Sequence, residues 1–167
     1  MTNCLHIYTG DGKGKTTACM GLALRFLSGG GRVLILQFMK GSPSGEIPLL
    51  EKLGASVKRL SKNYGFYPFK QTSAVIEEHN RLMSEALSFA QKGEGLLILD
   101  EIISAYSLSL LCRSQLLELL RHKNCEIVCT GRNAPPELIK LADYITEMKN
   151  VRHPYASGLG ARKGIEY

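Results

Sequence analysis

The chain has 167 residues and a mass of 18.4 kDa, which suits a single domain over residues 1–167. Hydrophobic residues make up 44% of it, and no apolar run approaches the roughly 20 residues of a membrane-spanning helix, so we expect no membrane association. The net charge of +6 permits a nucleic-acid partner, but the basic residues are scattered, so nucleic acid is disfavoured and a polyanionic small molecule explains them equally well.

Strands and helices alternate along the predicted chain. Apolar or alternating runs predict strands at residues 4–8, 33–39, 57–60, 96–99 and 127–130. Helical spacing of apolar residues predicts helices at residues 16–27, 47–53, 72–91, 113–122 and 135–141. This order indicates an α/β fold, a mostly parallel central sheet with helices on both faces and ligands at the carboxyl ends of the strands.

The five cysteines form no C-x-x-C pair, and the N-terminal MTNCLHIYTG lacks the segments of a signal peptide. We therefore expect a cytoplasmic protein without disulfides, in which the cysteines are small buried residues. Cys125 and Cys129 would share one strand face, but no second pair accompanies them, which disfavours a zinc site.

A phosphate-binding loop is predicted between the first strand and the first helix. The segment TGDGKGKTT, from Thr9 to Thr17, stands where a Walker A loop is found. Backbone N–H groups there would surround phosphate oxygens, while Lys15 would contact them and Thr16 would ligate Mg²⁺. Thr9 occupies the usual place of the first glycine, so nucleotide binding is a safer inference than hydrolysis. The nucleotide-binding candidates are Gly10, Asp11, Gly12, Lys13, Gly14, Lys15, Thr16 and Thr17.

Two further strand ends carry candidate residues. LLILDE resembles a Walker B strand, expected to neighbour the first strand, with Asp100 and Glu101 as metal-site acids. Without the phosphate-binding loop, the same pair could simply be an acidic helix start. Arg132 follows the strand at residues 127–130, so we expect it at the same sheet edge as a phosphate clamp, although a solvated arginine is the commoner case.

These motifs together resemble those of the P-loop corrinoid adenosyltransferases, the CobA/BtuR group. The matching stretches are TGDGKGKTT, QFMKG followed by Gly45-Glu46, LLILDE, the TGR turn, Leu141-Ala142-Asp143 and the final GIEY. The resemblance implies a P-loop NTPase (RecA-like) architecture. It also implies that Co(I) of cob(I)alamin or a precursor corrinoid attacks the 5′ carbon of ATP and releases triphosphate. A separate electron-delivering flavoprotein and a homodimer are implied as partners.

The resemblance also suggests roles for individual residues. Lys15, Arg132 and Glu101 become the catalytic candidates, and Thr16, Asp100 and Glu101 the candidate ligands of Mg²⁺, with Mn²⁺ possible. Lys13 would help to neutralise the leaving triphosphate. The further cofactor-binding candidates are Arg25, Lys40, Glu46 and Phe66.

The remaining segments are assigned by the same resemblance. Aromatic residues from Tyr64 to Phe69 match a region that closes over the corrinoid, although they could also form a small core under the loop. The tail over residues 151–167 resembles a cover over the nucleotide or, alternatively, a frayed terminus. His79 and His122 are predicted to be surface residues, and His153, in the tail, is placed where it could approach the ligand, with no role assigned.

Three other functions are compatible with parts of the sequence. A P-loop ATPase or kinase would use Glu101 to activate water and release ADP or phosphate. A RecA-like nucleic-acid-binding module would use the net charge and the loop from Lys62 to Lys70. A non-catalytic corrinoid carrier would bind both ligands without turnover.

Overall fold

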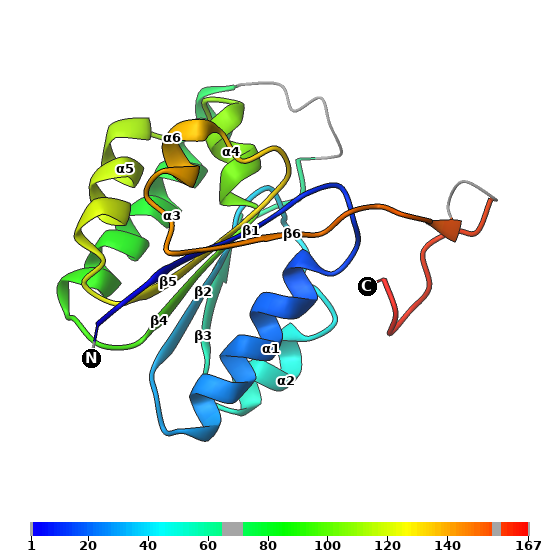
Figure 1. The fold of residues 1–167 in the computed structure, drawn as a ribbon, viewed down its shortest axis with the longest axis horizontal. Helices are drawn as coiled ribbons and strands as arrows, with labels where there is room; N and C mark the ends of the chain where they lie inside the picture. Colours follow the sequence, from blue (N-terminus) through cyan, green and yellow to red (C-terminus); the bar gives the residue numbers. More distant parts are fainter. Residues whose placement is uncertain (1, 65–71, 155–157, 167) are drawn as a thin grey trace.

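The computed structural model describes residues 2–64, 72–154 and 158–166, and its centre is a sheet of six parallel strands (Figure 1). The strand order is β3-β2-β4-β5-β1-β6, and every pairing is parallel. The strands are β1 (Leu5–Thr9), β2 (Val33–Gln37), β3 (Ser56–Arg59), β4 (Leu96–Asp100), β5 (Glu126–Thr130) and β6 (Tyr144–Glu147). The predicted α/β class is therefore confirmed.

Helices cover both faces of this sheet (Figure 1). The helices α1 (Lys15–Ser28) and α2 (Ile47–Lys52) lie on one face. The other face is covered by α3 (Ser73–Gln91), α4 (Ile102–Ser107), α5 (Arg113–His122) and α6 (Pro136–Ile139). The loops that follow β1, β2, β4 and β5 all leave from the carboxyl edge of the sheet, because the strands are parallel.

Alternate residues of the inner strands fill two separate cores. In β4, Leu97 and Leu99 pack with α3, α4, α5 and α6, whereas Leu96 and Ile98 pack with α1 and α2. Side chains of a strand point to opposite faces in turn, so a fully apolar strand serves both layers. All five residues of β4 are buried, and the fifth is Asp100. The sheet thus places a buried carboxylate at its carboxyl edge.

Most predicted elements are confirmed, with ends that shift by at most two residues. The helix α4 was missed because it follows β4 after the single residue Glu101, without an N-cap side chain. The strand β6 was missed because all four of its residues are exposed. The expected contact between the Walker B strand and β1 is wrong, since β5 lies between β4 and β1.

Two predictions of burial are also wrong. His79 is fully buried in α3, where it shares the core-facing side with Val75 and Leu82, and its Nδ1 is 2.7 Å from Val75 O. Cys112 is exposed and Cys4 is half-buried, whereas the other three cysteines are buried as expected. His79 is buried because it shares a helix face with core positions; the Val75 carbonyl lies next to its Nδ1, whereas its Nε2 has no hydrogen-bond partner among the described residues.

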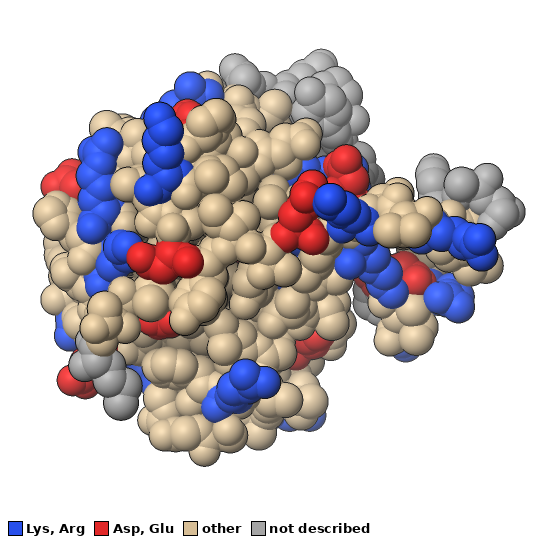
Figure 2. Space-filling model, viewed as in Figure 1, with Lys and Arg blue, Asp and Glu red and all other residues tan. Residues whose placement is uncertain are grey.

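Basic side chains are scattered over the face in Figure 2, with several on the projecting C-terminal segment. None of the helices in the described ranges combines the length and apolar character needed to span a bilayer.

Candidate nucleotide-binding site

The loop between β1 and α1 wraps a hollow at the carboxyl edge of the sheet. Gly10 and Gly14 have φ values of 99° and 114°, which side chains with a Cβ rarely adopt. The segment after β6 closes against this loop, since Gly12 N donates to Met148 O at 2.7 Å and Met148 N donates to Thr9 O at 2.8 Å. A Cβ on Gly10 would overlap the Met148 carbonyl oxygen. The segment after β6 thus fixes the conformation of the loop.

Lys15 begins α1 and folds back over the loop that precedes it. Its Nζ donates to Gly10 O at 2.6 Å and to Gly12 O at 2.8 Å. The residue is 8% exposed. Burial lowers the pKa of the Lys15 amine, while the Glu101 carboxylate acts in the opposite direction. Lys15 also lines the pocket, so its ammonium group can contact an anionic ligand there.

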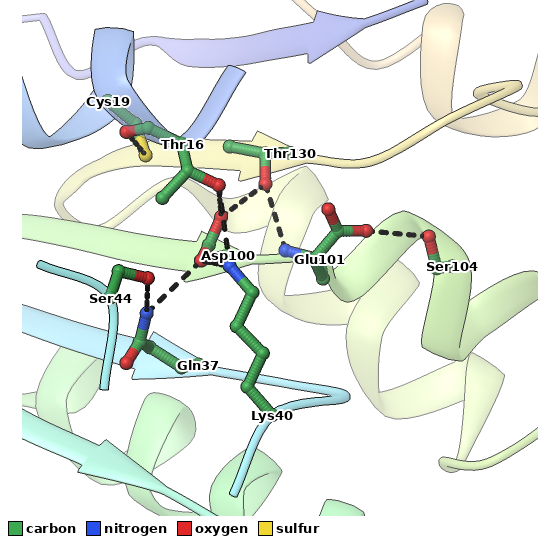
Figure 3. Close-up of polar contacts among 9 residues, drawn as sticks. All are labelled: Thr16, Cys19, Gln37, Lys40, Ser44, Asp100, Glu101, Ser104 and Thr130. Carbon is green, nitrogen blue, oxygen red and sulfur yellow. Dashed lines mark hydrogen bonds and ion pairs between the residues drawn. The ribbon is translucent and has the colours of Figure 1, made fainter. Parts of the chain in front are cut away.

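Four donors converge on the buried Asp100 (Figure 3). Thr16 Oγ1 and Thr130 Oγ1 donate to Asp100 Oδ1 at 2.9 and 2.8 Å. Gln37 Nε2 lies 3.4 Å from Oδ2, and the ammonium group of Lys40 donates to Oδ2 at 2.8 Å. A buried carboxylate needs such compensation, because its transfer out of water is otherwise unfavourable.

Lys40 reaches this carboxylate from the loop after β2. Met39 has a φ of 62°, so the chain turns sharply at the residue before it. Leu60 N donates to Lys40 O at 3.2 Å, and a Cβ on Gly41 would overlap the backbone at Lys62 and Asn63. Burial lowers the pKa of Lys40, but the Asp100 carboxylate and its hydrogen bond outweigh this effect, and the pKa is raised.

Glu101 stands at the junction of β4 and α4 with a φ of 62°. Its backbone N donates to Thr130 Oγ1 at 2.8 Å, and its carboxylate accepts a hydrogen bond of 2.8 Å from Ser104 Oγ. The left-handed turn separates the two acids, because Asp100 stays buried under the pocket while Glu101 lines it. The two carboxylates therefore have different surroundings and are not equivalent metal ligands.

The open side of the pocket carries three ion pairs. Arg132 Nη1 lies 3.9 Å from Asp11 Oδ1, and both side chains are 65% exposed, so the pair is loose. Lys13 Nζ donates to Glu166 Oε1 at 3.2 Å. Glu166 is also held by Arg162, whose backbone N and side chain both donate to the carboxylate. These hydrogen bonds lower the pKa of Glu166 to about 2.

Together these segments enclose a pocket of about 1120 Å³, large enough for a nucleotide with space to spare. Its lining residues come from the phosphate-binding loop, the loop after β2, the ends of β4 and β5, and the tail. They are Asp11, Gly12, Lys13, Gly14, Lys15, Thr16, Thr17, Lys40, Ser44, Gly45, Glu46, Glu101, Arg132, Asn150, His153, Gly164, Ile165 and Glu166.

Most of the predicted site residues that the structure describes line this pocket or lie directly beneath it. Arg25 is exposed in the last turn of α1, about 15 Å along the helix from Lys15, and does not line the pocket. Phe66 lies outside the described residues. Gly10 shapes the loop without lining the pocket. Tyr64, at the start of the predicted corrinoid cover, packs partly against the larger core.

Sequence reasoning missed several residues of the site. Gln37 and Thr130 are polar residues that directly follow the apolar runs of β2 and β5, and this position was the available signal. Asn150, Ile165 and Glu166 belong to the tail, which was expected to act as a cover but without individual roles. His153, which was thought able to approach a ligand, lines the same pocket.

The residues around Asp100 suit a divalent cation that shares its ligands with phosphate. Within the described ranges, no three His, Cys, Asp or Glu side chains gather as a ready-made metal site. Thr16 and Asp100 supply a hydroxyl and a carboxylate oxygen, the hard donors that Mg²⁺ accepts alongside water and substrate phosphates. The Lys40 ammonium, 2.8 Å from Asp100 and 3.5 Å from Thr16 Oγ1, already occupies a cation position beside both.

Known proteins resemble this chain along nearly its whole length. The family model described as "ATP:corrinoid adenosyltransferase BtuR/CobO/CobP" matches residues 1–167. The corrinoid adenosyltransferase of Escherichia coli K12 is 28% identical, over 96% of this chain and 84% of its own. The corrinoid adenosyltransferase CobA of Salmonella typhimurium LT2 is 29% identical over the same shares, and the corrinoid adenosyltransferase of Pseudomonas aeruginosa is 31% identical over 98% of this chain and 83% of its own. The chain belongs to the BtuR/CobO/CobP family of ATP:corrinoid adenosyltransferases.

Proposed function

We propose that the pocket holds the triphosphate of ATP on the phosphate-binding loop and leaves the 5′ carbon open to Co(I) of a reduced corrinoid. Two observations carry this proposal. The family match spans residues 1–167, and a buried carboxylate with a threonine hydroxyl stands directly beneath the loop. A site of this kind binds triphosphate without a protein nucleophile, as transfer to a metal nucleophile requires.

The bond changes leave little covalent chemistry for the protein. As the cobalt–carbon bond forms from the Co(I) electron pair, the bond between C5′ and its oxygen breaks, and the electrons pass to the leaving triphosphate. Lys13, Lys15 and Arg132 line the pocket and would offset this developing negative charge. Fixed charges in a shielded site are effective because they need no reorganisation during the reaction.

Mg²⁺ would be held by Thr16 and by Asp100, directly or through water. It would neutralise triphosphate oxygens and improve triphosphate as a leaving group. Glu101 would orient the shell from the pocket side, since its carboxylate is fixed by Ser104. Gln37 Oε1, a buried amide oxygen without a hydrogen-bond partner among the described residues, would be available to metal-bound water.

The test is an anaerobic incubation with chemically reduced cob(I)alamin, ATP and Mg²⁺. We expect loss of the Co(I) spectrum, a light-sensitive alkylcobalamin and intact triphosphate. Lys15→Ala should abolish this reaction. The matched control is Lys92→Ala, because Lys92 is an exposed lysine at the end of α3 outside the pocket lining. The Lys92→Ala variant should react like the unmodified protein.

Other products would favour other functions. Unreacted Co(I) with ADP or phosphate would indicate an ATPase that uses Glu101 to activate water. Binding of both ligands without product would indicate a carrier. Salt-sensitive binding to single-stranded nucleic acid would support the nucleic-acid module.

Three finer parts of the proposal rest on the family resemblance. They are electron delivery by a flavoprotein, a homodimer, and closure of Phe66 over the corrinoid. A cytoplasmic location is proposed as well. Sedimentation measurements test the dimer, and replacement of the chemical reductant by a reduced flavoprotein tests electron delivery. Phe66→Ala should weaken corrinoid affinity more than ATP affinity.

A further inference from the structure

Lys40 makes two contacts that binding of a metal ion with the nucleotide would have to break. Its Nζ is 2.8 Å from Asp100 Oδ2 and 3.5 Å from Thr16 Oγ1 (Figure 3). These are the two groups that the proposed function assigns to Mg²⁺. A divalent cation cannot approach both oxygens closely while an ammonium group occupies the space beside them.

We propose that Lys40 is an internal cation that holds the metal position of the nucleotide-free protein, and that it is displaced when the metal arrives with ATP. This inference rests on the proposed function, because it assumes that the metal binds at Thr16 and Asp100. Displacement would free the ammonium group to contact a triphosphate oxygen in the same pocket, which Lys40 already lines.

Burial of Asp100 gives the first argument. Its side chain is fully buried, and three of its four donors are neutral groups, from Thr16, Thr130 and Gln37. Lys40 therefore supplies the only positive charge that contacts this carboxylate among the described residues. Removal of that charge would leave a buried anion, which would attract another cation.

The second argument is that the backbone of Lys40 is fixed while its side chain is flexible. Its backbone is fixed by the hydrogen bond from Leu60 N and by the close approach of Gly41 to residues 62 and 63. The side chain has a flexible four-carbon stem and remains 30% exposed. The ammonium group can therefore leave the carboxylate toward the pocket without movement of the loop backbone that carries it.

The experiment measures Mn²⁺ binding to the nucleotide-free protein by electron paramagnetic resonance of the free ion. Mn²⁺ is a suitable probe because carboxylate and water ligands accept it as they accept Mg²⁺. The unmodified protein should bind it weakly. Lys40→Met, which keeps the apolar stem and removes the charge, should bind Mn²⁺ at least roughly tenfold more tightly. Lys40→Arg should behave like the unmodified protein.

Two controls identify the site of binding. The gain should disappear in the double variant Lys40→Met with Asp100→Asn. Lys13→Met removes a pocket charge that contacts Glu166 and not Asp100, so it should raise the affinity for Mn²⁺ far less. Equal affinities of the unmodified protein and Lys40→Met would overturn the inference, as would a gain that persists without the Asp100 charge.

Stability provides a second readout if Lys40→Met folds poorly. Mn²⁺ should raise the unfolding temperature of Lys40→Met by more than that of the unmodified protein, since a cation that binds the folded state stabilises it. An equal rise in both proteins would overturn the inference. Adenosyl transfer by the unmodified protein is measured separately, so failure of the proposed function remains distinguishable from failure of the Lys40 exchange.

Discussion

Thr130 provides a sharp test of how the carboxylate beneath the pocket is held. Its hydroxyl donates to Asp100 Oδ1 and accepts from Glu101 N, both at 2.8 Å, and the residue is fully buried. Thr130→Val keeps the shape but removes both interactions. A hydrogen bond to a charged acceptor contributes about 1.5–3 kcal/mol, and a buried N–H left unpaired costs about 1–3 kcal/mol. We therefore expect a loss of about 3 kcal/mol in the free energy of unfolding.

Urea unfolding followed by circular dichroism measures this loss. With a slope of about 2 kcal/mol per molar urea, the midpoint should fall by roughly 1.5 M. The matched control is Thr130→Ser, which keeps the hydroxyl and loses one methyl group, worth about 0.8 kcal/mol. Equal midpoints for the Val and Ser variants would refute the reasoning, because they would show that the two hydrogen bonds contribute nothing beyond packing.

Three further predictions concern single residues. Lys15→Ala should weaken ATP binding at least tenfold, about 1.4 kcal/mol, by calorimetry, and unchanged affinity would exclude phosphate contact by this lysine. Gly10→Ala should lower the free energy of unfolding by at least about 1 kcal/mol, because its φ of 99° disfavours a Cβ and the Met148 carbonyl blocks it; an unchanged urea midpoint would contradict this. Burial lowers the pKa of His79 from its ordinary value of 6.5, so the unfolded state binds a proton more readily than the folded state. The free energy of unfolding should therefore fall as the pH drops through 6.5, by at most about 1.4 kcal/mol per pH unit. His79→Gln should reduce this dependence of stability on pH.

The sequence predicted the layered fold because its inner strands are fully apolar and its helices have a clear apolar face. Strand order could not be obtained in this way. The expectation that β4 neighbours β1 failed because periodicity shows which faces a strand buries, but not which strand lies beside it. β5 occupies that place and brings Thr130 to Asp100, a contact that depends on the order of the strands.

His79 shows a different limit of sequence reasoning. Its position was readable, since Val75, His79, Leu82 and Ala86 follow helical spacing along α3. Its polarity suggested the surface, but the Val75 carbonyl next to Nδ1 permits burial. Lys40 was placed correctly in a loop, whereas its contact with Asp100 depends on a left-handed turn at Met39 that no local pattern indicates.

The pocket contains internal counterparts of both parts of its proposed ligand. Lys40 provides a cation at Asp100, where Mg²⁺ would bind. Glu166 provides an anion at Lys13, and with its pKa lowered to about 2 it stays charged at neutral pH. Exchange of each internal ion for a ligand ion of the same sign would keep Asp100 and Lys13 paired with an opposite charge before and after binding. Neither free Mg²⁺ nor metal-free ATP could make both exchanges, so the arrangement favours the complex of the two over either component alone.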